Sequence, residues 1–147
     1  MRLDGAGPLD VTGRLIGGCI ETLGPIAGTP YGAAARFAAA HAPEGLSVYL
    51  KAAQHHACTI CRHLHGMRLA GFFTGANTVM AGRTTAPDGA TLTPKQAVLD
   101  ALGGVAVPIM ADVECGHVPP YLPIVNGALG HLQFTDGTCS LTQTLVP

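Results

Sequence analysis

A short apolar run in the first half of the chain constrains the fold most. Residues 46–50 read Leu-Ser-Val-Tyr-Leu, with Pro43 and Gly45 just before the run and polar residues after it. A compact run of strand-forming residues, bounded by turn residues and polar residues, is typical of a buried strand. We therefore predict a central strand over residues 46–50.

The hydrophobic period changes directly after this strand. Between residues 53 and 69, apolar side chains recur at helical spacing, at Ala53, Ala57, Ile60, Leu64 and Met67. This spacing predicts an amphipathic helix that ends near Gly71. Another helix is predicted to begin at Thr93, because Thr93 can cap the backbone, Pro94 suits the first helical position and Gln96 can complete a capping box.

The remaining elements are expected to be short. Strands are predicted over residues 13–18, 77–82 and 105–113, antiparallel strands over residues 132–134 and 140–145, and brief helices over residues 20–23 and 33–42. Residues 1–12 are polar and rich in glycine, so we expect a loop there. Because strands and helices mix without strict alternation, the pattern predicts an α/β or α+β fold with a mixed β-sheet flanked by helices.

The composition indicates a single, tightly packed domain. The chain has 147 residues, 48% of them apolar and 12% charged, and a net charge of -1. These values suit one hydrophobic core and give no electrostatic attraction to nucleic acid. No stretch approaches the length of a membrane span, and the first residues lack the apolar segment of a secretory signal. We therefore expect a cytoplasmic protein without nucleic-acid or membrane partners, whose five cysteines are reduced thiols.

The end of the strand predicted over residues 105–113 carries the main functional signal. There the sequence reads Glu114-Cys115-Gly116-His117-Val118, which places an imidazole at the mouth of a buried strand, where a ring nitrogen can face a substrate. Residues 13–32 read GRLIGGCIETLGPIAGTPYG, and residues 115–128 read CGHVPPYLPIVNGA. Together these segments resemble the C-terminal domain of the LD-carboxypeptidases, the serine peptidase family that includes the microcin C immunity peptidases.

The resemblance implies a domain organisation and an activity. Residues 13–147 would form the C-terminal domain, with a swivelling-domain-like sheet, and residues 1–12 would take the place of a linker from an absent N-terminal domain that carries the nucleophile. The family hydrolyses amide bonds in murein tetrapeptides or in peptidyl-nucleotide antibiotics. A peptide or muropeptide-like substrate and a role in microcin C resistance are therefore expected. The expected assembly is a homodimer or a complex with an N-terminal nucleophile domain.

The resemblance also assigns catalytic positions. In the family, a serine from the N-terminal domain attacks the carbonyl carbon, and a histidine and a glutamate from the C-terminal domain complete the triad. His117 matches the histidine, whereas the glutamate position falls on Lys51, in the segment SVYLKAAQHH. An ammonium group repels the imidazolium that a carboxylate would stabilise. Because merely neutralising the acid of a serine triad costs about 10⁴-fold in rate, we expect this chain to be inactive alone.

No other residue is expected to supply the missing groups. Glu114 is too close in sequence to His117 to point at its ring, and neither Ser47 nor Ser140 lies on a turn that resembles a nucleophile elbow. The first alternative is therefore a structural one, in which His117 is a loop residue bonded to the backbone. In that case the chain is a dimerisation or interaction module that docks on a separate N-terminal domain.

Two glycine pairs, Gly17-Gly18 and Gly103-Gly104, do not have the spacing of a phosphate-binding loop, and we predict turns at both. In the resembled family the glycine-pair segment lies close to the cleft between the two domains. By that resemblance, Gly17, Gly18 and Cys19 are expected to line the substrate cleft.

The helix predicted over residues 53–69 carries a second chemical pattern. At about 100° per residue, Cys58, Cys61 and His65 fall on one face, as three zinc ligands on a helix would. A structural zinc site normally takes a fourth ligand and a turn-borne knuckle, and no such turn is nearby. A redox role for the two cysteines is less favoured still, because they lie inside the helix. We therefore expect no metal and no cofactor, and a zinc-binding domain is the second alternative.

Overall fold

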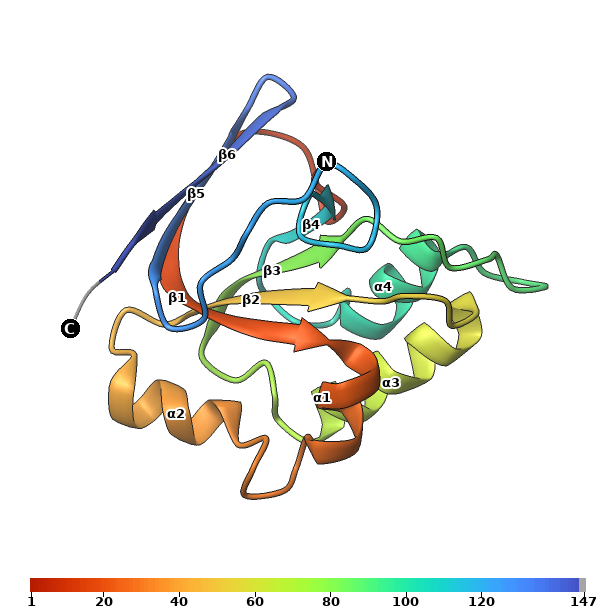
Figure 1. Cartoon of the computed structure of the whole chain (residues 1–147), viewed down its shortest axis with the longest axis horizontal. Helices are drawn as coiled ribbons and strands as arrows, with labels where there is room; N and C mark the ends of the chain where they lie inside the picture. Colours follow the sequence, from red (N-terminus) through yellow and green to blue (C-terminus); the bar gives the residue numbers. More distant parts are fainter. Residues whose placement is uncertain (146–147) are drawn as a thin grey trace.

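The apolar run at residues 46–50 forms β2 (Leu46–Lys51), which lies inside a six-stranded sheet of order β4-β3-β2-β1-β5-β6. The computed structural model describes residues 1–145, in which four helices accompany this sheet (Figure 1). The other strands are β1 (Leu9–Cys19), β3 (Ala76–Gly82), β4 (Ile109–Val113), β5 (Leu129–Thr135) and β6 (Thr138–Thr144). Strands β1 to β4 are parallel, while β5 and β6 run antiparallel to their neighbours. The mixed α/β fold predicted from the sequence is confirmed.

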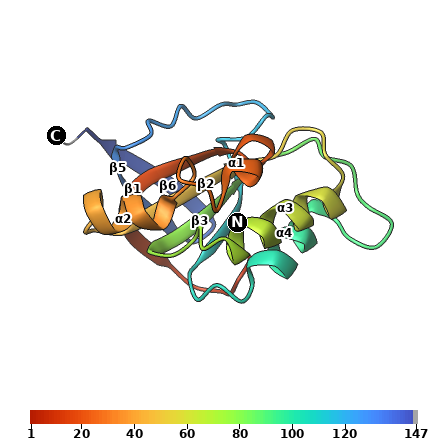
Figure 2. The ribbon, with the colours of Figure 1, turned by 90° about the horizontal axis from the view of Figure 1, so that it is seen from below.

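The helices are α1 (Ile20–Ile26), α2 (Ala34–His41), α3 (Ala57–Leu69) and α4 (Pro94–Leu102). They gather on one side of the sheet (Figure 2). Buried residues of all four helices share one core with Val48 and Leu50 of β2. Successive side chains of a strand point to opposite faces, so Tyr49 belongs to a second core on the other face of the sheet.

The second core is closed by the curl of the sheet itself. Leu15 of β1 and Met80 of β3 pack there with Leu132 of β5, and all three side chains are fully buried. Both faces of β2 are therefore dry along residues 46–50, which explains why its apolar residues do not alternate with exposed polar ones.

The predicted helix starts are confirmed at α4 and shifted at α3. Thr93 caps α4 through a complete capping box, with Gln96 N donating to Thr93 Oγ1 at 3.2 Å and Thr93 N donating to Gln96 Oε1 at 2.8 Å. Helix α3 begins at Ala57 instead of Ala53. Ala53 is held outside the helix, because its N–H donates to Glu21 and its carbonyl accepts from the hydroxyl of Thr84.

Three local predictions are wrong. β1 begins at Leu9, within the expected loop over residues 1–12, because Leu9 to Arg14 pair with β5. Gly17 and Gly18 lie in the extended end of β1 and do not form a turn. β4 begins at Ile109 instead of residue 105, because residues 105–107 form turns after α4. A linker function for residues 1–12 stays a prediction.

The two edge strands of the sheet, β4 and β6, differ in what lies beside them. Residues 1–3 run along β4, with Leu3 N donating to the carbonyl of Ile109 at 2.8 Å and Ala111 N donating to the carbonyl of Met1 at 2.7 Å. β6 forms the opposite edge. The first residues of the chain thus cover much of the outer side of β4.

The parallel strands end at a common edge, which we call the carboxyl edge. Cys19 ends β1 directly opposite Lys51 at the end of β2, and Gly82 ends β3 opposite Val113 at the end of β4. In open α/β sheets, ligands bind outside the carboxyl ends of the parallel strands. No helix in residues 1–145 is long and apolar enough to cross a membrane.

Candidate functional site at the carboxyl edge

The loop after β4 is held against the end of β3 by two glycines. A Cβ on Gly116 would overlap the backbone of Arg83, and a Cβ on Gly82 would lie 2.7 Å from the Cα of Gly116. This close approach lets the N–H of His117 donate to the carbonyl of Arg83 at 3.1 Å. The glycine before the histidine is therefore required for packing, and it fixes where the imidazole leaves the sheet.

The side chain of His117 is exposed and meets the end of β1. Its Nε2 lies 3.4 Å from Sγ of Cys19. Alternation along the strands accounts for this contact, because Cys19 and Lys51 lie on the same face as Leu15 and Tyr49, the face of the second core. Of the predicted site residues, the structure therefore brings His117 into contact with Cys19, and it places Lys51 opposite Cys19 on the neighbouring strand.

The thiol of Cys19 is neutral. Burial, followed by the hydrogen bond and charge of the neighbouring Glu21 carboxylate, raises its pKa to about 11. Reactive cysteines are instead thiolates in electropositive surroundings. The Cys19–His117 contact is therefore not an activated thiolate–imidazolium pair, because the sulfur keeps its proton.

Glu21 is a functional-site residue that the sequence analysis missed. It lies in the first turn of α1, where its Oε1 accepts from the N–H of Ala53 at 3.1 Å. Burial raises the pKa of Glu21, but hydrogen bonding to Cys19 and to the backbone outweighs burial, so the pKa lies below its ordinary value. Oε2 is buried without a well-formed hydrogen bond in residues 1–145. The edge thus holds an ionised carboxylate beside the Cys19 thiol.

No carboxylate contacts the ring of His117 within the described part of the chain. Glu114, weighed as a substitute for the acid, points elsewhere, with its Oε1 3.4 Å from Nη2 of Arg83. Lys51 stands across from Cys19 in the register of β1 and β2, and its positive charge reaches both Cys19 and Cys115. A cation therefore stands opposite Cys19, while its effect on His117 stays a prediction.

The two members of the Gly17-Gly18 pair in β1 have different surroundings. A Cβ on Gly17 would overlap the carbonyl oxygen of Tyr49 in β2, so only glycine fits there. The N–H of Gly17 donates to Oδ1 of Asn126 at 3.2 Å, and the hydroxyl of Tyr49 donates to the same oxygen at 3.0 Å. Gly18 instead faces the side chain of Leu23. Asn126 was not predicted, although the Asn126-Gly127 dipeptide marks a turn.

A cavity of about 460 Å³ opens beside this edge, under the loop that carries His117. Its walls are mainly apolar side chains of α3, α4 and the ends of β2 to β4, and Lys51 and Arg83 also line it. Arg83 donates from Nη2 to the carbonyl of Pro120 at 2.7 Å, while its buried Nε has no hydrogen-bond partner in residues 1–145. The cavity combines an apolar body with charged groups of both signs, because Asp88, Lys95 and Asp112 line it as well.

The two serines are far from a nucleophile's position. Ser47 is fully buried near the start of β2, at the other end of the strand from Lys51, and Ser140 lies exposed on the edge strand β6. Neither forms a hydrogen bond with His117 in residues 1–145. The described chain thus brings an imidazole, but not a hydroxyl nucleophile, to the carboxyl edge.

Comparison with known proteins identifies the family and the fold. A family model for the LD-carboxypeptidase C-terminal domain matches residues 12–132. No curated protein matches the sequence. Muramoyltetrapeptide carboxypeptidase from Oxalobacter formigenes has a similar structure, with a TM-score of 0.76 at 17% identity over 96% of this chain and 47% of its own.

Two further solved structures show the same fold. The microcin C7 self immunity protein MccF gives a TM-score of 0.72 at 22% identity over 97% of this chain and 40% of its own. An MccF-like protein from Bacillus anthracis gives 0.65 at 20% identity over 92% and 40%. The chain therefore spans less than half the length of each of these proteins. Since the family model covers most of the sequence, the chain belongs to the family of LD-carboxypeptidase C-terminal domains.

Proposed function

We propose that this domain supplies the proton-accepting histidine of a serine-peptidase active site, that the nucleophile comes from an N-terminal domain outside residues 1–147, and that the domain alone does not hydrolyse peptides. The position of His117 supports this proposal most directly. Its exposed imidazole stands at the carboxyl edge of four parallel strands, with its backbone held by Arg83 and its ring held by Cys19.

The hydrogen-bonding capacity of the neighbours selects one tautomer of His117. An ionised carboxylate only accepts hydrogen bonds, so Glu21 draws the thiol proton of Cys19 toward itself. The sulfur then presents a lone pair to Nε2 of His117, 3.4 Å away. Nε2 therefore carries the proton, and Nδ1 is the basic nitrogen that can take a proton from an incoming serine.

Lys51 is expected to lower the catalytic rate of this site. A carboxylate at its position would stabilise the imidazolium that forms when His117 accepts a proton, whereas an ammonium destabilises it. Glu21 compensates in part, but it acts through the thiol of Cys19 and does not touch the ring. We therefore expect a weak active site even after the nucleophile is supplied.

The proposed substrate is a peptide with a free terminal carboxylate, of the kind named for the muramoyltetrapeptide carboxypeptidase. Lys51 and Arg83 line the cavity and can bind that carboxylate through their positive charges, while the apolar walls contact side chains. The same cation that weakens catalysis would then favour substrate binding.

A reconstitution assay tests this proposal. The whole chain is mixed with the serine-bearing N-terminal domain of an LD-carboxypeptidase, and hydrolysis of a murein tetrapeptide is followed by chromatography. We expect no turnover from the chain alone and measurable turnover from the mixture. His117→Ala should lower the rate of the mixture by about 10² to 10⁴-fold, because a general base contributes about that much.

His131→Ala is the matched control. This histidine lies on β5 and pairs with Asp10 at 2.7 Å, so its loss should leave the rate unchanged. Association with the N-terminal domain without turnover would favour the alternative, an interaction module. The exposed side chains of Tyr121 and Val125, in the loop after His117, support that alternative because they could contact a partner. Sedimentation of the chain alone tests the proposed homodimer.

A further inference from the structure

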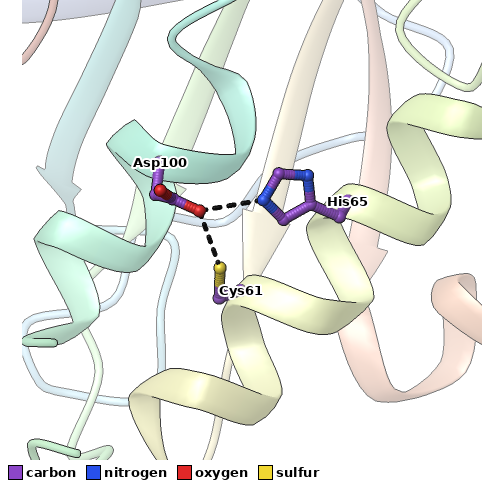
Figure 3. A group of neighbouring side chains, drawn as sticks. All are labelled: Cys61, His65 and Asp100. Carbon is purple, nitrogen blue, oxygen red and sulfur yellow. Dashed lines mark hydrogen bonds and ion pairs between the residues drawn. The ribbon is translucent and has the colours of Figure 1, made fainter. Parts of the chain in front are cut away.

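A second cluster of reactive side chains lies between α3 and α4. Cys61 and His65 project from one face of α3, and Asp100 projects from α4 toward both of them (Figure 3). Oδ2 of Asp100 lies 3.2 Å from Sγ of Cys61 and 2.9 Å from Nε2 of His65. All three ligand atoms lie within 4.8 Å of one another. The cluster is separate in sequence from the His117 loop and has no part in the proposed peptidase site.

We propose that Cys61, His65 and Asp100 bind one Zn²⁺ ion, with water in the fourth position. The donors are a sulfur, an imidazole nitrogen and a carboxylate oxygen, which are the three ligand types that zinc takes in proteins. Three protein ligands with one open position are typical of zinc sites that bind water or a small ligand.

The distances suit a tetrahedral ion. Zinc bonds of about 2.3 Å to sulfur and about 2.0–2.2 Å to nitrogen and oxygen place neighbouring ligand atoms about 3.3–3.6 Å apart. The two contacts of Asp100, at 3.2 and 2.9 Å, are shorter than this by only a few tenths of an ångström. A small rotation of the three side chains therefore opens the hydrogen-bonded triangle into a coordination site, without any movement of the helices.

The helix spacing explains why this set differs from the one considered from the sequence. Residues four apart lie above one another on a helix, so Cys61 and His65 face the same groove. Asp100, on the neighbouring helix, then occupies the place that Cys58 was expected to take. Cys58 is exposed one turn earlier on α3, and among residues 1–145 the metal-ligand cluster contains only the other three residues.

Solvent reaches the cluster, although its base is packed. Cys61 is half-buried against the core under the helices, and the side chains of His65 and Asp100 are 35% and 57% exposed. Hydrogen bonds from His65 and Cys61 keep the pKa of Asp100 below its ordinary value, so its carboxylate is already ionised. An ion can therefore enter from solvent, and the carboxylate of Asp100 is already negatively charged when it does.

Binding changes the protons of the other two ligands. Burial and Asp100 raise the pKa of the Cys61 thiol to about 11, so the thiol must lose its proton to the solvent when the Zn–S bond forms. The guanidinium of Arg68 donates to Nδ1 of His65 at 3.3 Å, which leaves the proton of the neutral ring on Nε2. Coordination through Nε2 moves that proton to Nδ1 and turns Arg68 away. One proton is released for each ion bound.

Calorimetric titration of the metal-free whole chain with Zn²⁺ tests the site. We expect one ion per chain and the release of about one proton, measured by repeating the titration in buffers of different ionisation enthalpy. Asp100→Asn and Cys61→Ser should each weaken binding by about 100-fold or more, since even indirect changes around a metal site cost 10–100-fold. Cys58→Ser, on the same helix, is the matched control and should bind like the wild type.

Cobalt substitution gives an independent readout that does not depend on the stability of the variants. Co²⁺ bound to the wild-type chain should show sulfur-to-metal charge-transfer absorption, which Cys61→Ser removes and Cys58→Ser retains. An equal loss in Cys58→Ser would overturn the assignment, because the ligand set would then contain Cys58 instead of Asp100. Failure to bind one ion per chain, or binding that neither Asp100→Asn nor Cys61→Ser weakens, would also overturn it.

Discussion

Nε2 of His117 lies 3.4 Å from Sγ of Cys19, a residue 98 positions earlier in the sequence. The contact joins the end of β1 to the loop after β4, and it exists because both strands are parallel and end at the same edge. In the tautomer proposed for His117, this contact leaves Nδ1 available to a substrate.

Loss of the thiol should change the tautomer of His117. In Cys19→Ala nothing accepts a hydrogen bond from Nε2, so the population with the proton on Nε2 should fall toward that of a solvated imidazole. Nitrogen-15 NMR of the ring at a pH where it is neutral measures this population directly. Cys139→Ala, which removes an exposed thiol on β6, is the control. An unchanged spectrum in Cys19→Ala would show that the sulfur does not orient the ring.

The charge at position 51 should control the rate of the reconstituted peptidase. Lys51→Met removes the repulsion of the imidazolium, and Lys51→Glu adds an attraction, so the rate should rise in the order wild type, Met, Glu. Each of the two steps should raise the rate about tenfold, which is the equivalent of one pKa unit. Lys95→Met, which removes a cation paired with Asp112 in the same cavity, serves as the control. Equal rates in all variants would mean that Lys51 does not act on His117.

Gly116→Ala should destabilise the fold, because its Cβ would overlap the carbonyl of Arg83 and force the His117 loop away from β3. Overpacking of this kind costs about 1–3 kcal/mol in the free energy of unfolding. Gly66→Ala is the matched control, with an effect of opposite sign. Nothing lies within 4 Å of the added methyl group, and the residue is inside α3. That change should stabilise by about 0.5–1 kcal/mol. Urea denaturation of both variants measures the two effects.

Glu21 should make the stability of the fold depend on pH. Its folded pKa lies below the ordinary value of 4.5, so its contribution is present above that value and is lost as the pH falls through the folded pKa. The difference in unfolding temperature between wild type and Glu21→Gln should therefore be largest at neutral pH and should shrink on acidification. A difference that stays constant between pH 7 and pH 3 would contradict this explanation.

The elements that the sequence predicted are those whose signals are local. The strand at residues 46–50, the capping box at Thr93 and the antiparallel strands expected near residues 132–134 and 140–145 depend on neighbouring residues, and all three are confirmed. The family resemblance rested on the segment around His117 and is also confirmed. The roles of Lys51 and His117 in catalysis stay predictions, which the experiments above address.

The features that were missed depend on contacts between distant segments. Leu9 begins β1 because β5, more than a hundred residues later, provides its partner. Gly17 was predicted to form a turn, whereas a glycine is needed there because the carbonyl of Tyr49 lies against it. Asp100 could not be recognised as a partner of Cys61 from the spacing within a single helix, since the packing of α3 on α4 brings them together.

The unequal edges of the sheet have a consequence for self-association. With residues 1–3 lying along β4, a foreign peptide cannot easily add its backbone on that flank. The other flank, β6, consists of uncharged side chains with the sequence TCSLTQT and offers no lysine or proline to deter an incoming strand. Growth of the sheet across molecules is therefore expected in one direction, through β6.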